Sequence, residues 1–409
     1  MMIKKITLSS FLLFFFVGIA SFFGQTKQID QINKIAPKKA FELSNNAQIS
    51  IITSGPGEVL YEKFGHSAIR VKDPVLNFDL IYNYGIFDFE NPTFYADFTK
   101  GFMKYKLAKY PFYLALKNAQ YYKRWVKEQV LNLSQAQKNE FFTILEINIL
   151  PENAGYLYDP YFDNCATKPR DIIKKVVGKN LIFKDDFVTQ KMSLRELMNN
   201  EIHQNTWGSL GINIALGSRL DKIATPSEYL YLPDYVFEAL NYSKILKDGK
   251  EENIISKTNI LLNFDEKQPK SDNFSPFLII LILSSLGLYI TYKDYKNAKR
   301  SKSLDFILFF TTGIIGVLIV YLWFFTNHST APNNFNFLWA FAPNLIVAFL
   351  LKQKKSPKWL SKYMLFLLVF LVISMIIWIT KTQLFSITLI PLFILLAVRY
   401  WFLQKTLNR

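Results

Sequence analysis

The sequence predicts two parts of different fold class: an α+β domain outside a membrane over residues 26–273, and an all-α bundle of transmembrane helices over residues 274–409. Two observations predict this division. Strand-like and helix-like patterns alternate within residues 26–273, and no apolar run there is long enough to cross a bilayer. Beyond residue 273, long apolar segments follow one another. A domain of about 250 residues is also large enough to bury a core without disulfides.

The composition agrees with a membrane protein. The chain has 409 residues, of which 50% are hydrophobic and 16% aromatic, and its formal net charge is +16. A basic balance is also typical of proteins that bind nucleic acid. Here, however, the Lys and Arg residues form short clusters beside apolar runs, as membrane topology requires. We therefore predict no nucleic-acid partner.

Residues 1–25 have the pattern of a secretory signal. Lys4 and Lys5 precede an apolar run over residues 6–23. The run is almost long enough to remain in the membrane, so a cleaved signal peptide and an uncleaved signal anchor both stay open. In either case, the residues that follow are expected to be exported.

The exported domain begins with strand patterns. Residues 49–53 form an apolar, β-branched run, a Gly-Pro-Gly turn follows at residues 55–57, and residues 66–71 alternate as in a strand. Residues 77–90 are a further strand candidate, ended by an Asn-Pro pair.

Helical patterns follow the strands. Residues 112–148 carry apolar positions at helical spacing, with Ser134 as a candidate N-cap within them. The run "ATKPRDIIKKVVG" (166–178) places its Ile and Val residues on one face and ends in Gly178. Pro169 fits this second helix only if it lies in the first turn.

Five apolar segments predict the membrane bundle. They cover residues 277–292, 304–325, 337–351, 363–380 and 384–403, of which the first and third are short for a span. The loops at residues 293–302 and 352–362 are strongly basic, whereas the loop at residues 326–336 has no Lys or Arg. By the positive-inside rule the basic loops are cytoplasmic. The α+β domain is then outside, on the side to which the signal delivers it.

Cys165 is the only cysteine of the chain. Free cysteines are usually small buried hydrophobic residues. An exported compartment permits disulfides, however, so a single unpaired thiol there risks oxidation without giving a bridge. Cys165 also directly precedes a predicted helix, whose N-terminal N–H groups and dipole stabilise a thiolate. We therefore predict that Cys165 is a nucleophile.

A nucleophilic thiol needs a base, and the chain has three histidines. His66, in "FGHSAIRV", stands at the start of a predicted strand and is our candidate base. His203 has the pattern of an exposed histidine at a helix end, with a structural role. His328 lies in the external loop at residues 326–336, either as an ordinary loop residue or as a contact for a head group or substrate.

The remaining site candidates are polar groups near these two residues. Asn83 is expected to orient the imidazole, by analogy with Cys-His-Asn sites, and its neighbour Tyr84 is a possible substrate contact. Asp163 and Asn164 are ordinary N-cap residues that can also support the site locally. The backbone N–H at Ala166 is a candidate donor to an oxyanion.

The residues around these candidates resemble a known family. "LYEKFGHSAIRVKD", "IYNYGIFDFE" and "YFDNCATKPRDII" are similar to the N-terminal periplasmic domain of the Lnb family of lipoprotein N-acyltransferases. "TWGSLGINIALGSRLD", "YLPDYVFEAL" and "NHSTAPNNFNFLWAFAPN" also follow that family's pattern. The order of His before Cys further resembles permuted papain-like acyltransferases of the lecithin–retinol type. That analogy implies a permuted papain-like (NlpC-like) fold for the exported domain.

The family resemblance implies an activity. The expected enzyme lies in the bacterial inner membrane with its catalytic domain on the periplasmic side, and His66 and Cys165 carry over as the catalytic pair. Its expected partners are a membrane phospholipid as acyl donor and a diacylated lipoprotein as acceptor. The acyl chain would pass through a thioester on Cys165. Three scattered histidines and one cysteine have no metal-ligand spacing, and we expect neither a metal nor another cofactor.

Two other functions stay open on the sequence. A papain-like peptidase or amidase acting on cell-wall peptides would use the same Cys165 and His66, although such an enzyme needs at most a membrane anchor. A non-catalytic exported binding domain on a membrane scaffold would keep Cys165 as a packed side chain. The stretch "TWGSLGINIALG" (206–217) is expected to be either a membrane-proximal amphipathic element or a packing element.

Overall fold

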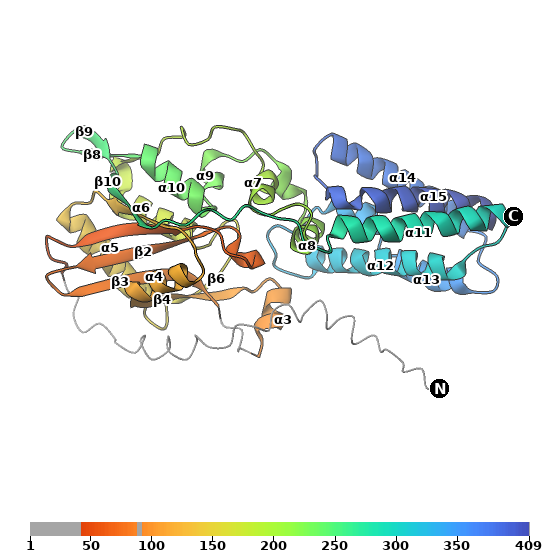
Figure 1. The fold of residues 1–409 in the computed structure, drawn as a ribbon, viewed down its shortest axis with the longest axis horizontal. Helices are drawn as coiled ribbons and strands as arrows, with labels where there is room; N and C mark the ends of the chain where they lie inside the picture. Colours follow the sequence, from red (N-terminus) through yellow and green to blue (C-terminus); the bar gives the residue numbers. More distant parts are fainter. Residues whose placement is uncertain (1–41, 88–91, 409) are drawn as a thin grey trace.

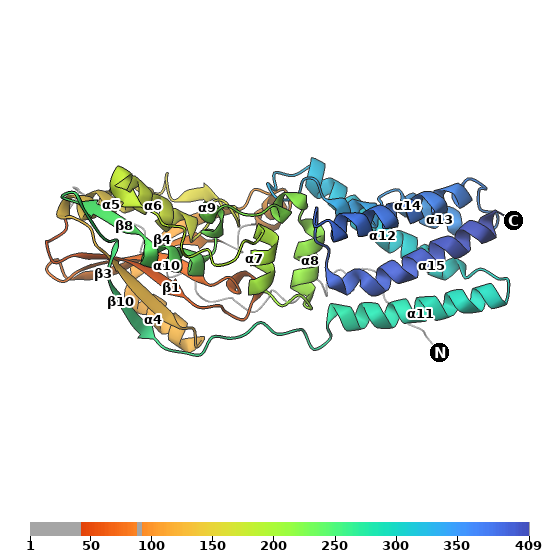
Figure 2. The same ribbon diagram turned by 90° about the horizontal axis from the view of Figure 1, so that it is seen from above.

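The computed structural model describes residues 42–87 and 92–408. The signal predicted at residues 1–25 lies outside the described residues. A mixed sheet-and-helix domain and a bundle of long helices lie end to end, giving an elongated molecule (Figures 1 and 2). The predicted fold class, an α+β domain followed by a helical membrane domain, is confirmed.

In the described residues, the sheet domain is built on seven strands in the order β10-β5-β1-β2-β3-β4-β6, and every neighbouring pair is antiparallel. The strands predicted at residues 49–53, 66–71 and 77–90 are three adjacent members of it. The strands are β1 (Gln48–Ser54), β2 (His66–Asp73), β3 (Phe78–Ile86), β4 (Lys104–Pro111), β5 (Val126–Leu131), β6 (Gly155–Leu157) and β10 (Ile255–Leu262).

Helices cover both faces of this sheet. On one face, alternate apolar residues of β1 and β2 join the main core with the helices that follow β5, whereas α4 packs on the other face in a smaller cluster. The helices are α3 (Phe94–Thr99), α4 (Phe112–Tyr121), α5 (Gln135–Asn148), α6 (Thr167–Val177), α7 (Leu194–Glu201), α8 (Trp207–Ala215), α9 (Pro226–Tyr229) and α10 (Pro233–Tyr242). A small second sheet contains β7 (Leu181–Ile182), β8 (Lys244–Lys247) and β9 (Lys250–Asn253).

The helical pattern predicted over residues 112–148 is wrong in its middle. Ser134 does cap α5, with a complete capping box, and α4 also lies in this region. Between the two helices, β5 pairs with both β1 and β10. Its charged residue Glu128 is buried against Arg70 of β2 at 2.9 Å, and this pairing lets a polar residue occupy the sheet interior. Pairing with distant strands therefore overrides the local helical spacing.

The membrane domain, as described to residue 408, contains five α-helices: α11 (Pro276–Lys296), α12 (Lys302–Phe324), α13 (Asn344–Lys352), α14 (Leu360–Ile379) and α15 (Ile390–Leu407). Four helices in the described part of the chain are long and apolar enough to cross a bilayer, and α13 is not one of them. Its nine residues reach about 13 Å, against the roughly 30 Å of a hydrocarbon core.

The third predicted span, residues 337–351, is therefore a broken segment. It consists of the end of a 3₁₀ turn (Phe335–Leu338), a short connection through Pro343, and α13. This segment packs closely on α12. A Cβ at Gly316 would lie only 2.0 Å from the Ala340 carbonyl oxygen, so only glycine permits that approach.

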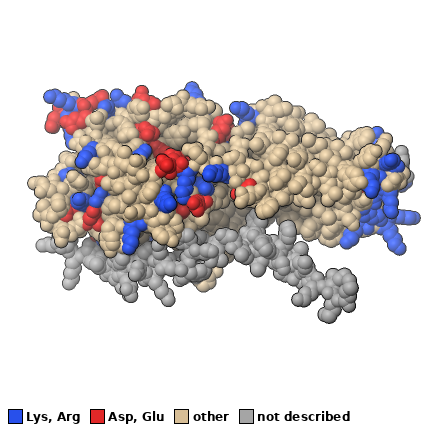
Figure 3. Space-filling model, viewed as in Figure 1, with Lys and Arg blue, Asp and Glu red and all other residues tan. Residues whose placement is uncertain are grey.

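The charge distribution agrees with the predicted orientation. Lys and Arg side chains gather at the end of the bundle farthest from the sheet domain, and the bundle's middle shows almost no charge (Figure 3). Lys293 and Lys296 lie in the last turn of α11, and Lys352 lies in the last turn of α13. Under the positive-inside rule this end faces the cytoplasm, and the sheet domain faces the opposite side.

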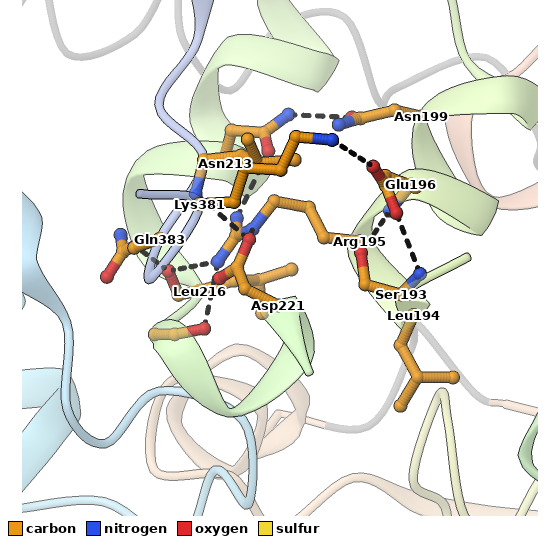
Figure 4. Close-up of polar contacts among 12 residues, drawn as sticks. Ser193, Leu194, Arg195, Glu196, Asn199, Asn213, Leu216, Asp221, Lys381 and Gln383 are labelled. Carbon is orange, nitrogen blue, oxygen red and sulfur yellow. Dashed lines mark hydrogen bonds and ion pairs between the residues drawn. The ribbon is translucent and has the colours of Figure 1, made fainter. Parts of the chain in front are cut away.

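The segment from α7 to residue 221 packs at the junction of the two domains, and α8 lies between them in both views (Figures 1 and 2). The side chain of Arg195 is fully buried there: it pairs with Asp221 at 2.8 Å and donates to the carbonyl oxygens of Leu216 and Gly217 (Figure 4). From the membrane domain, the Leu384 N–H donates to the same Asp221 at 3.0 Å. The stretch at residues 206–217 is thus a packing element at the domain junction.

Candidate active site

Cys165 lies just before α6, where Asn164 organises the start of the helix. The side-chain oxygen of Asn164 accepts the N–H groups of Ala166 at 2.9 Å and Thr167 at 3.0 Å. Its amide nitrogen donates to the carbonyl oxygens of Pro160 and Tyr231, each at 2.8 Å. This buried amide therefore fixes the backbone on both sides of Cys165, a residue that is itself half-buried.

His66 opens β2 and lies between Asn83 and Cys165. Its Nε2 lies 2.6 Å from Oδ1 of Asn83 on the adjacent strand β3, and its ring is close enough to the Cys165 side chain for each group to shift the other's pKa. The amide nitrogen of Asn83 donates to the Tyr110 hydroxyl at 2.9 Å, which leaves Oδ1 as an acceptor. Nε2 therefore carries the hydrogen, and Nδ1 is the nitrogen left for the thiol.

The thiol and the imidazole shift each other's ionisation. Burial alone would raise the pKa of Cys165, but the charge and hydrogen bond of His66 and the Ser67 N–H bring it below its ordinary value. Burial alone would lower the pKa of His66, but Cys165 and then Asn83 raise it above its ordinary value. Both directions favour a thiolate–imidazolium pair at neutral pH.

Arg124 is a further charged group of this site that sequence reasoning missed. Its Nε donates to the Gly55 carbonyl at 2.7 Å, and its guanidinium lies 3.6 Å from Glu62. The pKa of Arg124 lies below its ordinary value, because burial lowers it more than the charges of Glu62 and then Cys165 raise it. The charge of Arg124 in turn lowers the pKa of His66. Arg124 lies between α4 and β5, where the helical interpretation gave no reason to expect a site residue.

Two of the other predicted site residues have structural roles. Tyr84 is buried in the main core, and its hydroxyl accepts from Asn148 at 2.8 Å, so the predicted substrate contact is wrong. The carboxylate of Asp163 pairs with Lys168 at 2.7 Å. Ala166 is also unsuitable as an oxyanion donor, since Asn164 already accepts its N–H.

The other two histidines lie in connecting segments. His203 follows α7, and its Nδ1 accepts the N–H of Asn205 at 3.1 Å, in keeping with a structural role. His328 lies in the loop between α12 and α13, with its ring 6.4 Å from that of Phe98. A contact between His328 and a head group stays a prediction.

Comparison with protein families identifies both parts of the chain. The model of the Lnb N-terminal periplasmic domain matches residues 38–200, and the model of the Lnb transmembrane domain matches residues 267–408. The chain belongs to the Lnb family. His66, Asn83 and Cys165 all lie within the first match. No curated protein and no solved structure matched the chain.

In this Lnb-family chain, aromatic rings connect the site with the membrane domain. We call them the aromatic strip. Successive ring centroids are 4.3 to 6.5 Å apart along Tyr156, Tyr158, Tyr105, Phe87, Phe94 and Phe98, and Phe98 reaches His328. Phe98 is 46% exposed on α3. Directly after α3, the carbonyl oxygen of Lys100 accepts the N–H of Asn327 from the loop after α12. The strip therefore ends where the membrane domain begins.

The described part of this Lnb-family chain contains no group of three His, Cys, Asp or Glu side chains that could hold a metal ion. The groups that the site offers are the thiol of Cys165, an imidazole held by an amide, and a nearby guanidinium.

The ion pair gives a pH prediction for the Lnb-family site. Because His66 lowers the pKa of Cys165, iodoacetamide should alkylate the wild-type thiol at pH values below those needed for a free thiol. In His66→Ala only burial and weaker contacts remain, so the midpoint of alkylation should rise by at least about one pH unit. Alkylation rates across pH 5–10, followed by intact mass on the full-length protein in detergent, measure this midpoint. His203→Ala is the matched control, and an unchanged midpoint in His66→Ala would contradict the ion pair.

Proposed function

We propose that this protein is a lipoprotein N-acyltransferase that moves an acyl chain from a membrane phospholipid, through a thioester on Cys165, to the N-terminal amine of a diacylglyceryl lipoprotein cysteine. The observation that carries the proposal is a His66 imidazole bonded to Asn83 and electrostatically coupled to Cys165, in a domain attached to a membrane bundle. Membership of the Lnb family supports the same role. The site of action is the outer face of the inner membrane.

The first half-reaction forms the thioester. His66 holds the proton of Cys165, and the thiolate attacks the ester carbonyl carbon of the phospholipid. The tetrahedral intermediate collapses with cleavage of the carbon–oxygen bond. The lysophospholipid oxygen takes the proton from the His66 imidazolium as it leaves. Asn83 keeps the ring oriented throughout, since its Oδ1 accepts the Nε2 hydrogen.

The second half-reaction transfers the acyl group. The neutral α-amine of the lipoprotein attacks the thioester carbonyl while His66 takes a proton from the attacking nitrogen. The carbon–sulfur bond then breaks, which leaves an amide on the lipoprotein and regenerates the thiolate–imidazolium pair. A thiolate is a good leaving group, and the depressed pKa of Cys165 improves it further.

The aromatic strip favours a lipid donor over a cell-wall peptide. Its outer end, Phe98, is exposed next to the loop that leaves α12. Phe324 at the end of α12 and Phe325 directly after it are also exposed. Aromatic side chains at this level are typical of the membrane–water interface. An acyl chain leaving the bilayer at this point meets a continuous apolar surface up to Tyr156 and Tyr158. A cell-wall peptidase has no need for such a surface.

The proposal is tested with the full-length protein in vesicles that contain phospholipid with a labelled acyl chain. We expect one acyl chain to be bound per protein by a bond that neutral hydroxylamine cleaves, as a thioester requires. Phe98→Asp should slow acylation from vesicles by roughly tenfold or more, because a charge at the interface opposes lipid contact. The same variant should react normally with a short-chain soluble ester. Tyr113→Asp, at an exposed aromatic on α4, is the matched control.

The two alternative functions predict other outcomes in this assay. A cell-wall peptidase would cleave muropeptides without forming an acyl-enzyme from phospholipid, and a binding domain would do neither. Either result with the wild-type protein would refute the proposed acyl transfer. Equal loss of vesicle and soluble-ester reactivity in Phe98→Asp would refute the lipid role of the strip alone.

A further inference from the structure

Every acyl transfer through a thiol places negative charge on the carbonyl oxygen, and the site needs donors for it. The Ala166 and Thr167 N–H groups at the start of α6 are both taken by Oδ1 of Asn164. The backbone N–H groups of Ser67 and Cys165 both act on the Cys165 sulfur and lower the pKa of the thiol. Backbone donors are therefore at hand, and the question is which side chain lies beside them as a further donor.

Tyr156 has an unpaired hydroxyl close to the Cys165 side chain. Its Oη is buried and has no hydrogen-bond partner among the described residues, which is costly unless a ligand supplies one. The position of Gly85 shows how close this hydroxyl lies to the Cys165 side chain. A Cβ built at Gly85 would lie 3.8 Å from Cβ of Cys165 and 4.0 Å from Oη of Tyr156. The absence of a side chain at residue 85 thus leaves space between the cysteine and the tyrosine.

The ring of Tyr156 is held in place from several sides. Nζ of Lys168 lies 4.4 Å from the ring centroid, and Asp163 fixes that lysine through an ion pair of 2.7 Å. The ring of Tyr84 meets it edge-on at 6.1 Å. Burial, and then the charge of Cys165, raise the pKa of Tyr156, so its hydroxyl keeps its proton at neutral pH. A fixed, protonated hydroxyl is what a preorganised donor requires.

We propose that Tyr156 is an oxyanion-hole residue: its hydroxyl donates a hydrogen bond to the carbonyl oxygen of the acyl group while Cys165 forms and breaks the thioester, beside the Cys165 N–H. This inference rests on the proposed acyl transfer and adds a catalytic residue to it. It also gives Asp163 and Lys168 a role, as residues that position the tyrosine ring rather than touch the substrate.

The test is Tyr156→Phe in the full-length protein, because phenylalanine keeps the ring and removes only the hydroxyl. A short-chain p-nitrophenyl ester serves as the acyl donor, so the result does not depend on lipid delivery. We expect acylation of Cys165 to slow by about 10²–10³-fold, the usual effect of losing one oxyanion donor. The alkylation rate of Cys165 and its pH midpoint should stay at the wild-type values, since the nucleophile itself is unaltered.

Tyr84→Phe is the matched control, since its hydroxyl is bound to Asn148 in the core, and it should acylate at nearly the wild-type rate. Wild-type acylation in Tyr156→Phe would overturn the inference. So would equal losses of acylation and alkylation, because the hydroxyl would then act on the thiol. Failure of the proposed function is a separate outcome: wild-type protein would react with the p-nitrophenyl ester but not with phospholipid.

Discussion

Cys165→Ala should leave lipoproteins in the diacyl form in a strain that relies on this protein for N-acylation. The variant removes the only cysteine of the chain, and no other thiol can carry the acyl group. Losing the nucleophile of such a site costs on the order of 10⁴-fold or more in rate. Mass spectrometry of the N-terminal lipopeptides distinguishes the triacyl form from the diacyl form. We expect the triacyl form to fall below detection.

His66→Ala should give the same diacyl product, since the base and the ion pair are lost together. Asn83→Ala should retain partial activity, because it loosens the imidazole without removing it. His203→Ala is the control and should leave the triacyl form unchanged. Membrane fractions probed for each variant must contain comparable amounts of protein. Full N-acylation in both Cys165→Ala and His66→Ala would refute the mechanism.

Local patterns in the sequence predict much of the fold. Strand alternation around His66 and Asn83, and the helix after Cys165, follow from the side-chain periodicity of short segments. Ser134 marks the start of a helix because its side chain accepts a backbone N–H of the first turn. Gly178 marks the end of a helix because it adopts the positive φ that ends the helical backbone. The sequence also placed Cys165, His66 and Asn83 as one candidate site. Strand order made that possible, since His66 and Asn83 belong to consecutive antiparallel strands.

Features that depend on distant contacts were missed. The residues of β5 show helical spacing locally, and only their pairing with β1 and β10 makes them a strand. Arg124 precedes β5 and Tyr156 lies on β6, two strands that are far apart in the sheet order, so no spacing along the chain relates them to the cysteine. A signal for Tyr156 existed in "GYLYD", but alternating tyrosines at a turn are more often packing residues.

Helix length and helix capping also depend on neighbours. The third membrane segment is apolar enough to suggest a span, but Pro343 and close packing on Gly313 and Gly316 of α12 limit α13 to nine residues. An Asn-Cys pair before a helix predicts that the asparagine caps the helix. Here the side chain of Asn164 does so by accepting the N–H of Ala166. A group used to organise the helix cannot also bind the oxyanion, and this is why the predicted role of Ala166 is wrong.

The largest loss of stability is expected for Arg195→Met at the domain junction. The guanidinium is fully buried and bonded to Asp221, Asn213 and two carbonyl oxygens, while Asp221 also holds the Leu384 N–H (Figure 4). Removing the arginine leaves an uncompensated buried carboxylate. Breaking a buried pair in this way costs about 3–5 kcal/mol of the free energy of unfolding. Denaturation of the full-length protein in detergent, followed by tryptophan fluorescence, measures the loss.

A double variant separates lost charge pairing from lost packing. In Arg195→Met with Asp221→Leu no buried charge remains, so the double variant should be more stable than Arg195→Met alone. Lys184→Ala removes one partner of an exposed pair with Glu251, and its cost should stay under about 1 kcal/mol. If the double variant were no more stable than the single one, packing rather than the ion pair would hold the junction. Because the junction also bonds to the loop after α12 through the N–H groups of Gly217 and Ser218, Arg195→Met should lose vesicle acylation while its Cys165 is still alkylated. Loss of both reactivities together would mean that the whole sheet domain unfolds.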